Sequence, residues 1–118
     1  MNKPHVLVVI DFPPLREFVV RLLMEQGYHT ETAENGQEGW ERFQRNPFDA
    51  VVSDNLMPLM TGPELAALVK QMDRYMPVIL LTGTLEALPP GVDYLVKKPI
   101  DKNMLLGTLR MVLRRGAV

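Results

Sequence analysis

The chain has 118 residues, of which 47% are hydrophobic and 23% are charged, and its formal net charge is −1. This length and composition are typical of a soluble globular protein with a single core, so we expect one domain over residues 1–118. The nearly balanced charge excludes a strong general attraction to nucleic acid or to an anionic membrane surface. The sequence has no cysteine, which excludes disulfides, thiolate metal sites and cysteine nucleophiles.

The first residues, Met1–His5, lead directly into an apolar run and lack the successive basic, apolar and cleavage-site regions of a signal peptide. No apolar stretch approaches the ~18 residues that a membrane span requires. We therefore expect a soluble cytoplasmic protein that binds neither a membrane nor nucleic acid directly.

Five short apolar runs along the chain are predicted to be strands: His5–Asp11, His29–Ala33, Ala50–Asp54, Val78–Thr82 and Val92–Val96. The first, third and fourth are continuously apolar over most of their length, which is typical of parallel strands covered on both faces. The second alternates between apolar and polar residues, so we expect it at an edge of the sheet.

Helical patterns lie between the predicted strands. The first follows Pro13 and ends before Gly27, the second covers Glu38–Gln44, the third follows Pro63, and the last begins at a predicted cap, Asp101. Helical spacing predicts that the following apolar side chains face the core: Leu15, Phe18, Val19, Leu22, Leu23, Trp40, Phe43, Leu65, Leu68, Val69, Met72, Leu105, Leu109, Val112 and Leu113. The alternation of strands and helices predicts an α/β fold with a doubly wound parallel sheet and right-handed crossovers.

Chemically informative residues close the predicted strands. In a doubly wound sheet the functional site lies at the carboxyl ends of the strands, where the strand order reverses. The first run ends at Asp11, the third at Asp54 and the fourth at Thr82, and Lys98 follows the fifth. Taken singly, each of these residues also has a structural explanation, for example as a turn residue or a buried hydroxyl. Their common placement at four strand ends favours a functional site.

These four residues have the chemistry of a phosphoryl-transfer site. Two neighbouring carboxylates favour a hard divalent cation with oxygen ligands, which we predict to be Mg²⁺. The Lys98 ammonium and the Thr82 hydroxyl can each bind an oxygen of a phosphoryl group. Asp54, on the central strand, is then the predicted nucleophile that becomes an acyl phosphate.

Four short motifs in chain order carry a resemblance to a known family. They are Val6-Leu-Val-Val-Ile-Asp11, Ser53-Asp-Asn-Leu-Met-Pro58 with Thr61-Gly62, Pro77-Val-Ile-Leu-Leu-Thr-Gly83, and Lys98-Pro99. Over nearly its whole length the chain resembles the receiver domains of two-component response regulators. The resemblance implies a flavodoxin-like fold, as in chemotaxis regulators, with a five-stranded parallel sheet in the order 2-1-3-4-5. It also implies a cis peptide bond before Pro99.

The resemblance further implies a role for each site residue. Asp54 resembles the phosphoacceptor of the family, and Asp11 resembles a direct metal ligand. Leu56 resembles the residue whose backbone carbonyl completes the protein ligands of Mg²⁺, together with Asp11 and Asp54. Thr82 resembles the switch hydroxyl that moves toward the phosphoryl group, and Lys98 resembles the lysine that contacts it.

The implied function is that of a phosphorelay switch, not of an enzyme with a separate substrate. The chain would take a phosphoryl group from the phosphohistidine of a histidine kinase or histidine phosphotransfer domain, and then change its contacts with an unidentified downstream protein. Its own chemistry would be limited to self-phosphorylation and self-dephosphorylation. The sequence leaves open whether the chain stands alone or is part of a larger protein, and whether the apolar arc of the last predicted helix forms a homodimer.

Two features of the sequence differ from what is usual in the family, one at the end of the first strand and one in the last crossover. Relatives usually carry two acidic residues at the end of the first strand, but the first of the pair is Ile10 here, which weakens the expected attraction for Mg²⁺. The crossover Gly83–Val92 is short and contains Pro89, Pro90 and Gly91. We therefore expect one helical turn or an irregular loop there, so that the fourth helix of the family is shortened or missing.

The switch is also expected to differ. The position of the family's switch aromatic falls on Leu95, one residue after Tyr94, which predicts an altered switch. Thr84 lies where some relatives carry a carboxylate that helps to position water, and Leu56 is likewise apolar. These two residues predict slow loss of the phosphoryl group.

Two alternative functions stay open from the sequence. A pseudo-receiver would keep the fold and act as a protein-interaction module without phosphorylation; Ile10, Leu95 and the short crossover favour it, whereas Asp54, Thr82 and Lys98 oppose it. A small flavodoxin-like enzyme or nucleotide binder is disfavoured, because the chain has neither a G-x-x-x-x-G-K nor a G-x-G-x-x-G loop.

Overall fold

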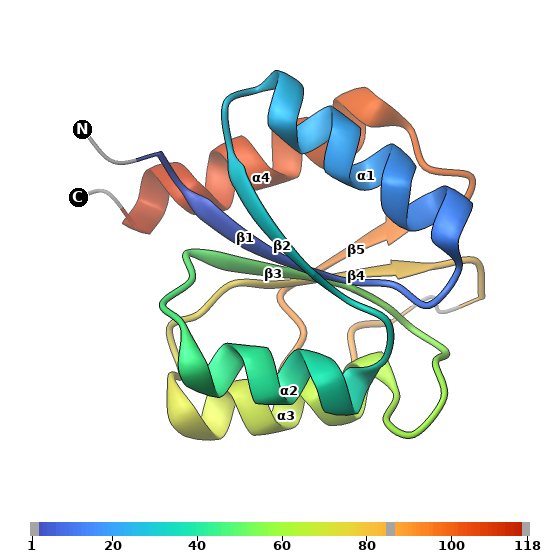
Figure 1. Ribbon diagram of the computed structural model, residues 1–118, viewed down its shortest axis with the longest axis vertical. Coiled ribbons are helices and arrows are strands. Elements are labelled where there is room, and N and C mark those ends of the chain that lie inside the picture. The colour runs from blue at the N-terminus through green and yellow to red at the C-terminus, as the bar shows by residue number, and fades with distance from the viewer. Residues whose placement is uncertain (1–2, 85–86, 117–118) are drawn as a thin grey trace.

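One parallel sheet with the strand order β2-β1-β3-β4-β5 forms the centre of the computed structural model (Figure 1). The structure describes residues 3–84 and 87–116. Helices α1 and α4 cover one face of the sheet, and α2 and α3 cover the other. The doubly wound α/β fold and its strand order are therefore confirmed, and the carboxyl ends of all the strands lie at the same edge of the sheet.

The strands are β1 (His5–Val9), β2 (His29–Ala33), β3 (Ala50–Asp54), β4 (Val78–Thr82) and β5 (Tyr94–Lys97). The bounds of β2, β3 and β4 match the prediction, whereas β1 ends earlier than predicted and β5 begins and ends later. Every residue of β3 and β4 is buried, and β2 at the edge is partly exposed. The continuous apolar patterns thus identified the three central strands, and the alternating pattern identified the edge strand β2.

The helices are α1 (Pro13–Glu25), α2 (Gly36–Arg45), α3 (Gly62–Met72) and α4 (Lys102–Gly116). Thr61 and Glu64 form a reciprocal capping box at the start of α3. Asp101 Oδ1 accepts hydrogen bonds from two backbone N–H groups of the first turn of α4, which confirms the predicted cap. None of the described helices is both long and apolar enough to cross a membrane.

Two hydrophobic clusters, one on each face of the sheet, hold the layers together. Because side chains alternate along a strand, Val6 and Val8 pack with α1 and α4, whereas Leu7 and Val9 pack with α2 and α3. All four side chains are fully buried. The central strands of the sheet are therefore enclosed on both faces.

Two residues that were predicted to face the core are exposed. Phe18 is 38% exposed and Met72 is 56% exposed. Phe18 lies beside the stripe of α1 that packs on the sheet, which is filled by Val19 and Leu23. Met72 is the last residue of α3, and the buried positions of that helix end at Val69. Helical spacing identified the apolar arc of each helix but overestimated its width and its length.

The connection from β4 to β5 has no helix in its described residues, 83–84 and 87–93. A shortened crossover in place of a regular helix is therefore confirmed. Gly91 has a φ of 86°, and a Cβ at this position would lie 3.2 Å from the backbone of Ala66 on α3. The segment thus lies so close to α3 that a side chain at position 91 would require the Ala66 backbone to shift by a few tenths of an ångström.

Asp93 anchors the end of this crossover. Its Oδ2 accepts hydrogen bonds from Lys70 Nζ at 2.7 Å and from the Val78 backbone N–H at 2.8 Å. Lys70 Nζ also donates to the Met76 carbonyl at 2.6 Å. The Asp93 side chain therefore ties the end of the irregular segment to α3 and β4.

Candidate functional site

The sheet brings the four predicted site residues to one edge. Asp54 and Thr82 are the last residues of β3 and β4, and Asp11 and Lys98 shortly follow the ends of β1 and β5. These four strands are consecutive neighbours in the sheet and all run parallel. Neighbouring strands lie about 4.8 Å apart, so the four residues surround one small region at the carboxyl edge.

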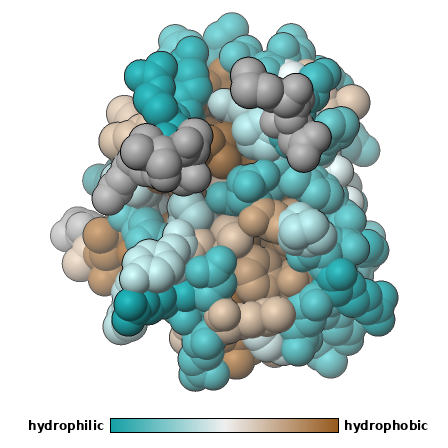
Figure 2. All heavy atoms as spheres, turned by 90° about the vertical axis from the view of Figure 1, so that its left-hand side faces the viewer, coloured by the Kyte–Doolittle hydropathy of each residue, from teal (hydrophilic) through white to brown (hydrophobic). Residues whose placement is uncertain are grey.

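The opposite end of the sheet is hollowed but carries none of these residues. Figure 2 shows hydrophobic residues at the centre of this end and hydrophilic residues around them. The hollow has a volume of about 1110 Å³ and is lined, among others, by His5, Phe48 and Met76. Lys70 and Asp93, which also line it, are paired with each other. The four predicted site residues therefore lie at the carboxyl edge, away from this hollow.

Asp54 is a buried carboxylate with two partners on one oxygen. The residue is 4% exposed. Lys98 Nζ lies 2.7 Å from Asp54 Oδ1, and the Asn55 backbone N–H donates to the same oxygen at 2.9 Å. Among the described residues, no contact falls on Oδ2. Oδ2 is therefore the carboxylate oxygen that can bind a ligand or attack an electrophile.

Lys98 is positioned by the backbone of β4. Its N–H donates to the Thr82 carbonyl at 2.9 Å, and the Lys98–Pro99 peptide bond is cis, as the sequence resemblance implies. The neighbouring Lys97 is exposed and makes no ion pair within the described residues. Of the two adjacent lysines, the structure thus brings Lys98 to the Asp54 carboxylate.

Thr82 is 1% exposed, and two of the described residues donate hydrogen bonds to its hydroxyl. The Thr84 backbone N–H donates to Thr82 Oγ1 at 3.2 Å, and the Asn55 side-chain amide donates to it at 3.4 Å. Asn55 is itself 8% exposed. The sequence analysis gave Asn55 no role in the site, because residue order alone does not show which way a side chain points beyond a strand end.

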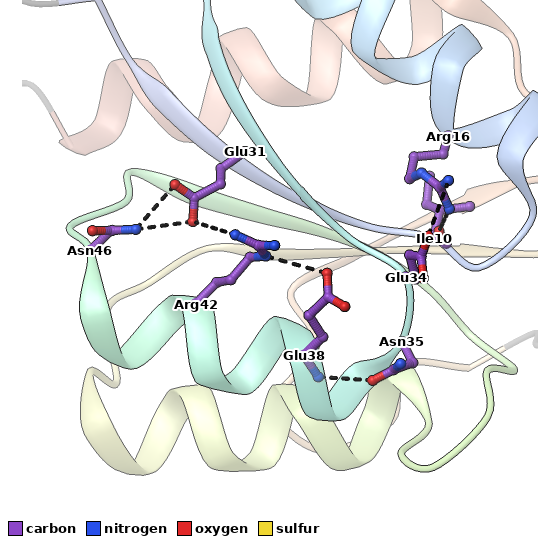
Figure 3. A network of polar contacts seen from close by, with 8 residues as sticks. All are labelled: Ile10, Arg16, Glu31, Glu34, Asn35, Glu38, Arg42 and Asn46. Atoms are coloured by element: carbon purple, nitrogen blue, oxygen red, sulfur yellow. Dashed lines mark hydrogen bonds and ion pairs between the residues drawn. The ribbon is translucent and has the colours of Figure 1, made fainter.

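The loop that carries Asp11 is held by an arginine that the sequence reasoning did not identify. Arg16 Nη1 donates to the Ile10 carbonyl at 2.8 Å and to the Asp11 carbonyl at 3.4 Å, and Nη2 lies 3.9 Å from a carboxylate oxygen of Glu34 (Figure 3). Ile10 itself is fully buried in the cluster between the sheet and α1 and α4. Arg16 therefore fixes the backbone beside Asp11. Ile10, at the position of the family's first acidic residue, packs in the hydrophobic core instead.

The second polar network in Figure 3 joins β2 to α2 and lies away from Asp54. Asn46 Nδ2 donates to both carboxylate oxygens of Glu31 at 3.0 Å, and Arg42 lies 3.3 Å from Glu38 and 3.9 Å from Glu31. These contacts connect the edge strand to its neighbouring helix, and they have no link to the predicted site residues.

A close turn after Asp54 brings the start of α3 against the site. The Gly62 N–H donates to the Asn55 carbonyl at 2.8 Å, and a Cβ on Gly62 would overlap the Asp54 carbonyl. Leu59 has a φ of 71°, which reverses the chain within this turn. Leu56 is 71% exposed, so its side chain points away from the site and only its backbone can serve there.

The oxygen donors at this edge fit a magnesium ion. The described residues contain no cluster of three or more His, Cys, Asp and Glu side chains that could hold a metal. A metal at this edge would therefore depend on the two carboxylates of Asp11 and Asp54 and on the Leu56 carbonyl. Mg²⁺ commonly uses one or two carboxylates and keeps several waters or phosphate oxygens, which this small donor set allows.

Comparison with known proteins identifies the family. The family model of the response regulator receiver domain matches residues 6–110. The transcriptional regulatory protein GlrR of Escherichia coli (strain K12) is 35% identical to 98% of this chain, which spans only 28% of GlrR. The response regulator receiver protein CpdR of Brucella abortus (strain 2308) is 35% identical over 92% of this chain and 96% of CpdR.

A solved structure agrees with the sequence comparisons. The response regulator protein TrrA of Thermotoga maritima, in complex with Mg²⁺-BeF, has a TM-score of 0.86 and 30% sequence identity, over 92% of this chain and 98% of TrrA. The residues matched by the family model, 6–110, include Asp11, Asp54, Thr82 and Lys98 at the carboxyl ends of four strands. On its sequence, its strand order and the residues gathered at the ends of its strands, the chain belongs to the response regulator receiver domain family.

Proposed function

We propose that this chain is a phosphoacceptor switch of a two-component phosphorelay, which takes a phosphoryl group from a phosphohistidine onto Asp54 in the presence of Mg²⁺. The state of the Asp54 carboxylate carries this proposal. Lys98 and the Asn55 backbone hold Oδ1, and Oδ2 has no partner among the described residues. A buried carboxylate that is fixed by one oxygen and open at the other is suited to nucleophilic attack.

The transfer follows from these contacts. Asp54 Oδ2 attacks the phosphorus in line with the phosphohistidine nitrogen, so an O–P bond forms as the N–P bond breaks and the nitrogen keeps its electron pair. The Lys98 ammonium, already 2.7 Å from Oδ1, is close enough to bind an oxygen of the transferred group. Bound Mg²⁺ would supply neutralisation of the phosphoryl charge, held by Asp11, Asp54 and the Leu56 carbonyl.

A change in the orientation of the Thr82 hydroxyl would then couple phosphorylation of Asp54 to the rest of the fold. This hydroxyl lies at the end of β4, between the phosphoacceptor strand and Lys98, whose N–H is bonded to the Thr82 carbonyl. When the hydroxyl turns to donate to a phosphoryl oxygen, it gives up the hydrogen bond from the Thr84 N–H, which lies in the crossover. Phosphorylation of Asp54 is thus coupled to the backbone of the irregular crossover.

The partners of such a switch are proteins. The phosphoryl donor is a histidine kinase or a histidine phosphotransfer domain, and the output is an altered contact with a downstream protein. No separate small-molecule substrate is required, since the only covalent change is on Asp54, so the chain is proposed not to be an enzyme. Magnesium dependence and a cytoplasmic location are parts of the same proposal.

Intact mass measurement tests the proposal. The native chain is incubated with acetyl phosphate or phosphoramidate and Mg²⁺, beside an Asp54→Ala variant and an Asp73→Asn variant. Asp73 is a matched carboxylate at the end of α3, away from the carboxyl edge. One phosphoryl adduct on the native chain and on Asp73→Asn, and none on Asp54→Ala, supports the proposal. A folded native chain that gains no adduct from these donors or from a phosphohistidine protein contradicts it and favours a phosphorylation-independent interaction module.

A further inference from the structure

The side-chain amide of Asn55 holds the hydroxyl that has to move. Both residues are almost completely buried, Asn55 at 8% exposed and Thr82 at 1%. Asn55 Nδ2 donates to Thr82 Oγ1 at 3.4 Å, from the residue that directly follows the phosphoacceptor. We propose that Asn55 is a positioning residue that keeps the Thr82 hydroxyl in its resting orientation and thereby sets how readily the site closes on a phosphoryl group. This inference rests on the proposed function.

The backbone of Asn55 is fixed on three sides. Its N–H lies 3.1 Å from the Leu81 carbonyl and 2.9 Å from Asp54 Oδ1, and its carbonyl accepts from the Gly62 N–H at 2.8 Å. These contacts tie it to β4, to the phosphoacceptor and to the start of α3. The backbone that carries the amide is therefore held in place, so the amide can follow Thr82 only by rotation about its own side-chain bonds.

The mobile half of the pair is Thr82. A rotation about its side-chain bond that turns Oγ1 toward Asp54 Oδ2 breaks the bond from Asn55 as well as the bond from the Thr84 N–H. The Thr84 bond lies within a single turn and depends only on the Thr82 hydroxyl, so it would form with any residue at position 55. The Asn55 bond, by contrast, depends on the side chain at position 55, so a substitution there changes this restraint on the Thr82 hydroxyl.

Breaking this bond has a cost because of where it lies. In the resting state the Asn55 amide has a hydrogen-bond acceptor in a buried environment, and it loses that acceptor when Thr82 turns away. A buried donor without a partner opposes the switched state. A residue with an apolar side chain at position 55 has no donor to satisfy, so it favours switching.

The first measurement is made on the free 118-residue chain. Three-bond couplings of the Thr82 γ-methyl group report its side-chain rotamer in the native protein, in Asn55→Leu and in Asn55→Ala. We expect one dominant rotamer in the native chain and a shift toward a second rotamer in both variants. Asn103→Leu, which removes an exposed amide at the start of α4, is the matched control and is expected to leave Thr82 unchanged.

The second measurement uses beryllofluoride with Mg²⁺ as a phosphoryl analogue. We expect Asn55→Leu to bind beryllofluoride about 3- to 10-fold more tightly than the native chain, which corresponds to the loss of one restraining hydrogen bond. In a Thr82→Val background, which lacks the hydroxyl, the same substitution is expected to change the affinity by less than about 2-fold. A general structural role of Asn55 would alter both backgrounds equally.

The two measurements separate this inference from the proposed function. An unchanged Thr82 rotamer in folded Asn55→Leu and Asn55→Ala overturns the positioning role, whether or not beryllofluoride binds. Equal or weaker beryllofluoride binding by Asn55→Leu overturns its link to switching. If the rotamer shifts in both variants but the native chain binds no beryllofluoride and gains no phosphoryl adduct, the restraint on Thr82 stands and the proposed function fails.

Discussion

The ion pair between Lys98 Nζ and Asp54 Oδ1, 2.7 Å long, connects the chain after β5 to the end of β3 and so passes over the intervening strand β4. One partner is buried and the other is partly exposed, with side-chain exposures of 6% for Asp54 and 36% for Lys98. The pair therefore has two consequences, since it supports the carboxyl edge of the sheet and holds a cation at the proposed nucleophile.

Replacing Lys98 with Met is expected to lower both stability and phosphorylation. The substitution leaves Asp54 as a buried carboxylate without its counter-charge, which should reduce the free energy of unfolding by about 1–2 kcal/mol, allowing for the partial exposure of Lys98. Urea unfolding measures this loss, and intact mass after acetyl phosphate treatment measures the fall in adduct. The double variant Asp54→Asn, Lys98→Met should regain most of the stability but none of the adduct. Equal stability of native chain and Lys98→Met would show that the pair contributes nothing to the fold.

Gly62 is expected to tolerate no side chain. A Cβ at this position would overlap the Asp54 carbonyl and a methyl carbon of Leu80, so Gly62→Ala should be destabilised by about 1–3 kcal/mol. Gly107→Ala is the matched control, because a Cβ on Gly107 meets nothing within 4 Å and the residue lies within α4. It should stabilise the chain by about 0.5–1 kcal/mol. Thermal unfolding of both variants checks the opposite signs.

The sequence predicted the fold closely because buried parallel strands have a continuous apolar pattern. All residues of β3 and β4 are buried, and their bounds were predicted to the residue. The order of the strands came from the resemblance and not from periodicity. Helical spacing was less accurate, as the exposure of Phe18 and Met72 shows, because an apolar arc does not reveal how much of it the sheet covers.

The candidate site was predictable only where a residue type closes a strand. Asp54, Thr82 and Lys98 follow that rule, and the structure brings them together. Arg16 and Asn55 do not follow it, because each acts through a side chain that reaches back to a neighbouring segment. Such contacts depend on the tight turns after β1 and β3, and strand or helix periodicity carries no information about those turns.

The groove beside α1 is expected to receive the protein that donates the phosphoryl group. It has a volume of about 620 Å³ and includes Val20 and Met24, of which Met24 is 62% exposed. Changing both residues to Ser should slow phosphotransfer from a cognate histidine kinase by about 10-fold or more, as removal of apolar interface anchors does. Labelling by acetyl phosphate should stay unchanged, since a small donor makes no contact there. Parallel losses with both donors would instead indicate damage to the site.

The capping box of α3 predicts a dependence on pH. The Thr61 backbone N–H donates to Glu64 Oε1 at 2.9 Å, and this contact, supported by the Thr61 side chain, holds the pKa of Glu64 below its ordinary value of 4.5. A lowered pKa means that the cap is fully formed above the ordinary value and is lost as the pH falls through the lowered one. Carboxyl-carbon NMR titration should give Glu64 a midpoint below 4.5, and Thr61→Ala should move it upward.

Ile10 offers a test of charge at the proposed metal site. Its side chain is fully buried between the sheet and α1 and α4, where relatives of the family usually carry an acidic residue. Ile10→Asp should therefore lower the stability of the fold and raise the affinity for Mg²⁺. The loss of apolar burial should destabilise the fold by about 2–4 kcal/mol. The added carboxylate beside Asp11 should tighten Mg²⁺ binding by about 5- to 10-fold, from roughly 1 kcal/mol of additional attraction at a partly solvated site.

Ile10→Asn separates these two effects, because it removes the same apolar side chain without adding charge. It should lose a similar amount of stability, measured by urea unfolding, and show no gain in Mg²⁺ affinity, measured by calorimetric titration. If only Ile10→Asp binds Mg²⁺ more tightly than the native chain, the natural isoleucine stabilises the core and lowers the affinity for the metal. If the two variants bind Mg²⁺ equally well, position 10 does not reach the metal, and Asp11, Asp54 and the Leu56 carbonyl determine the affinity without it.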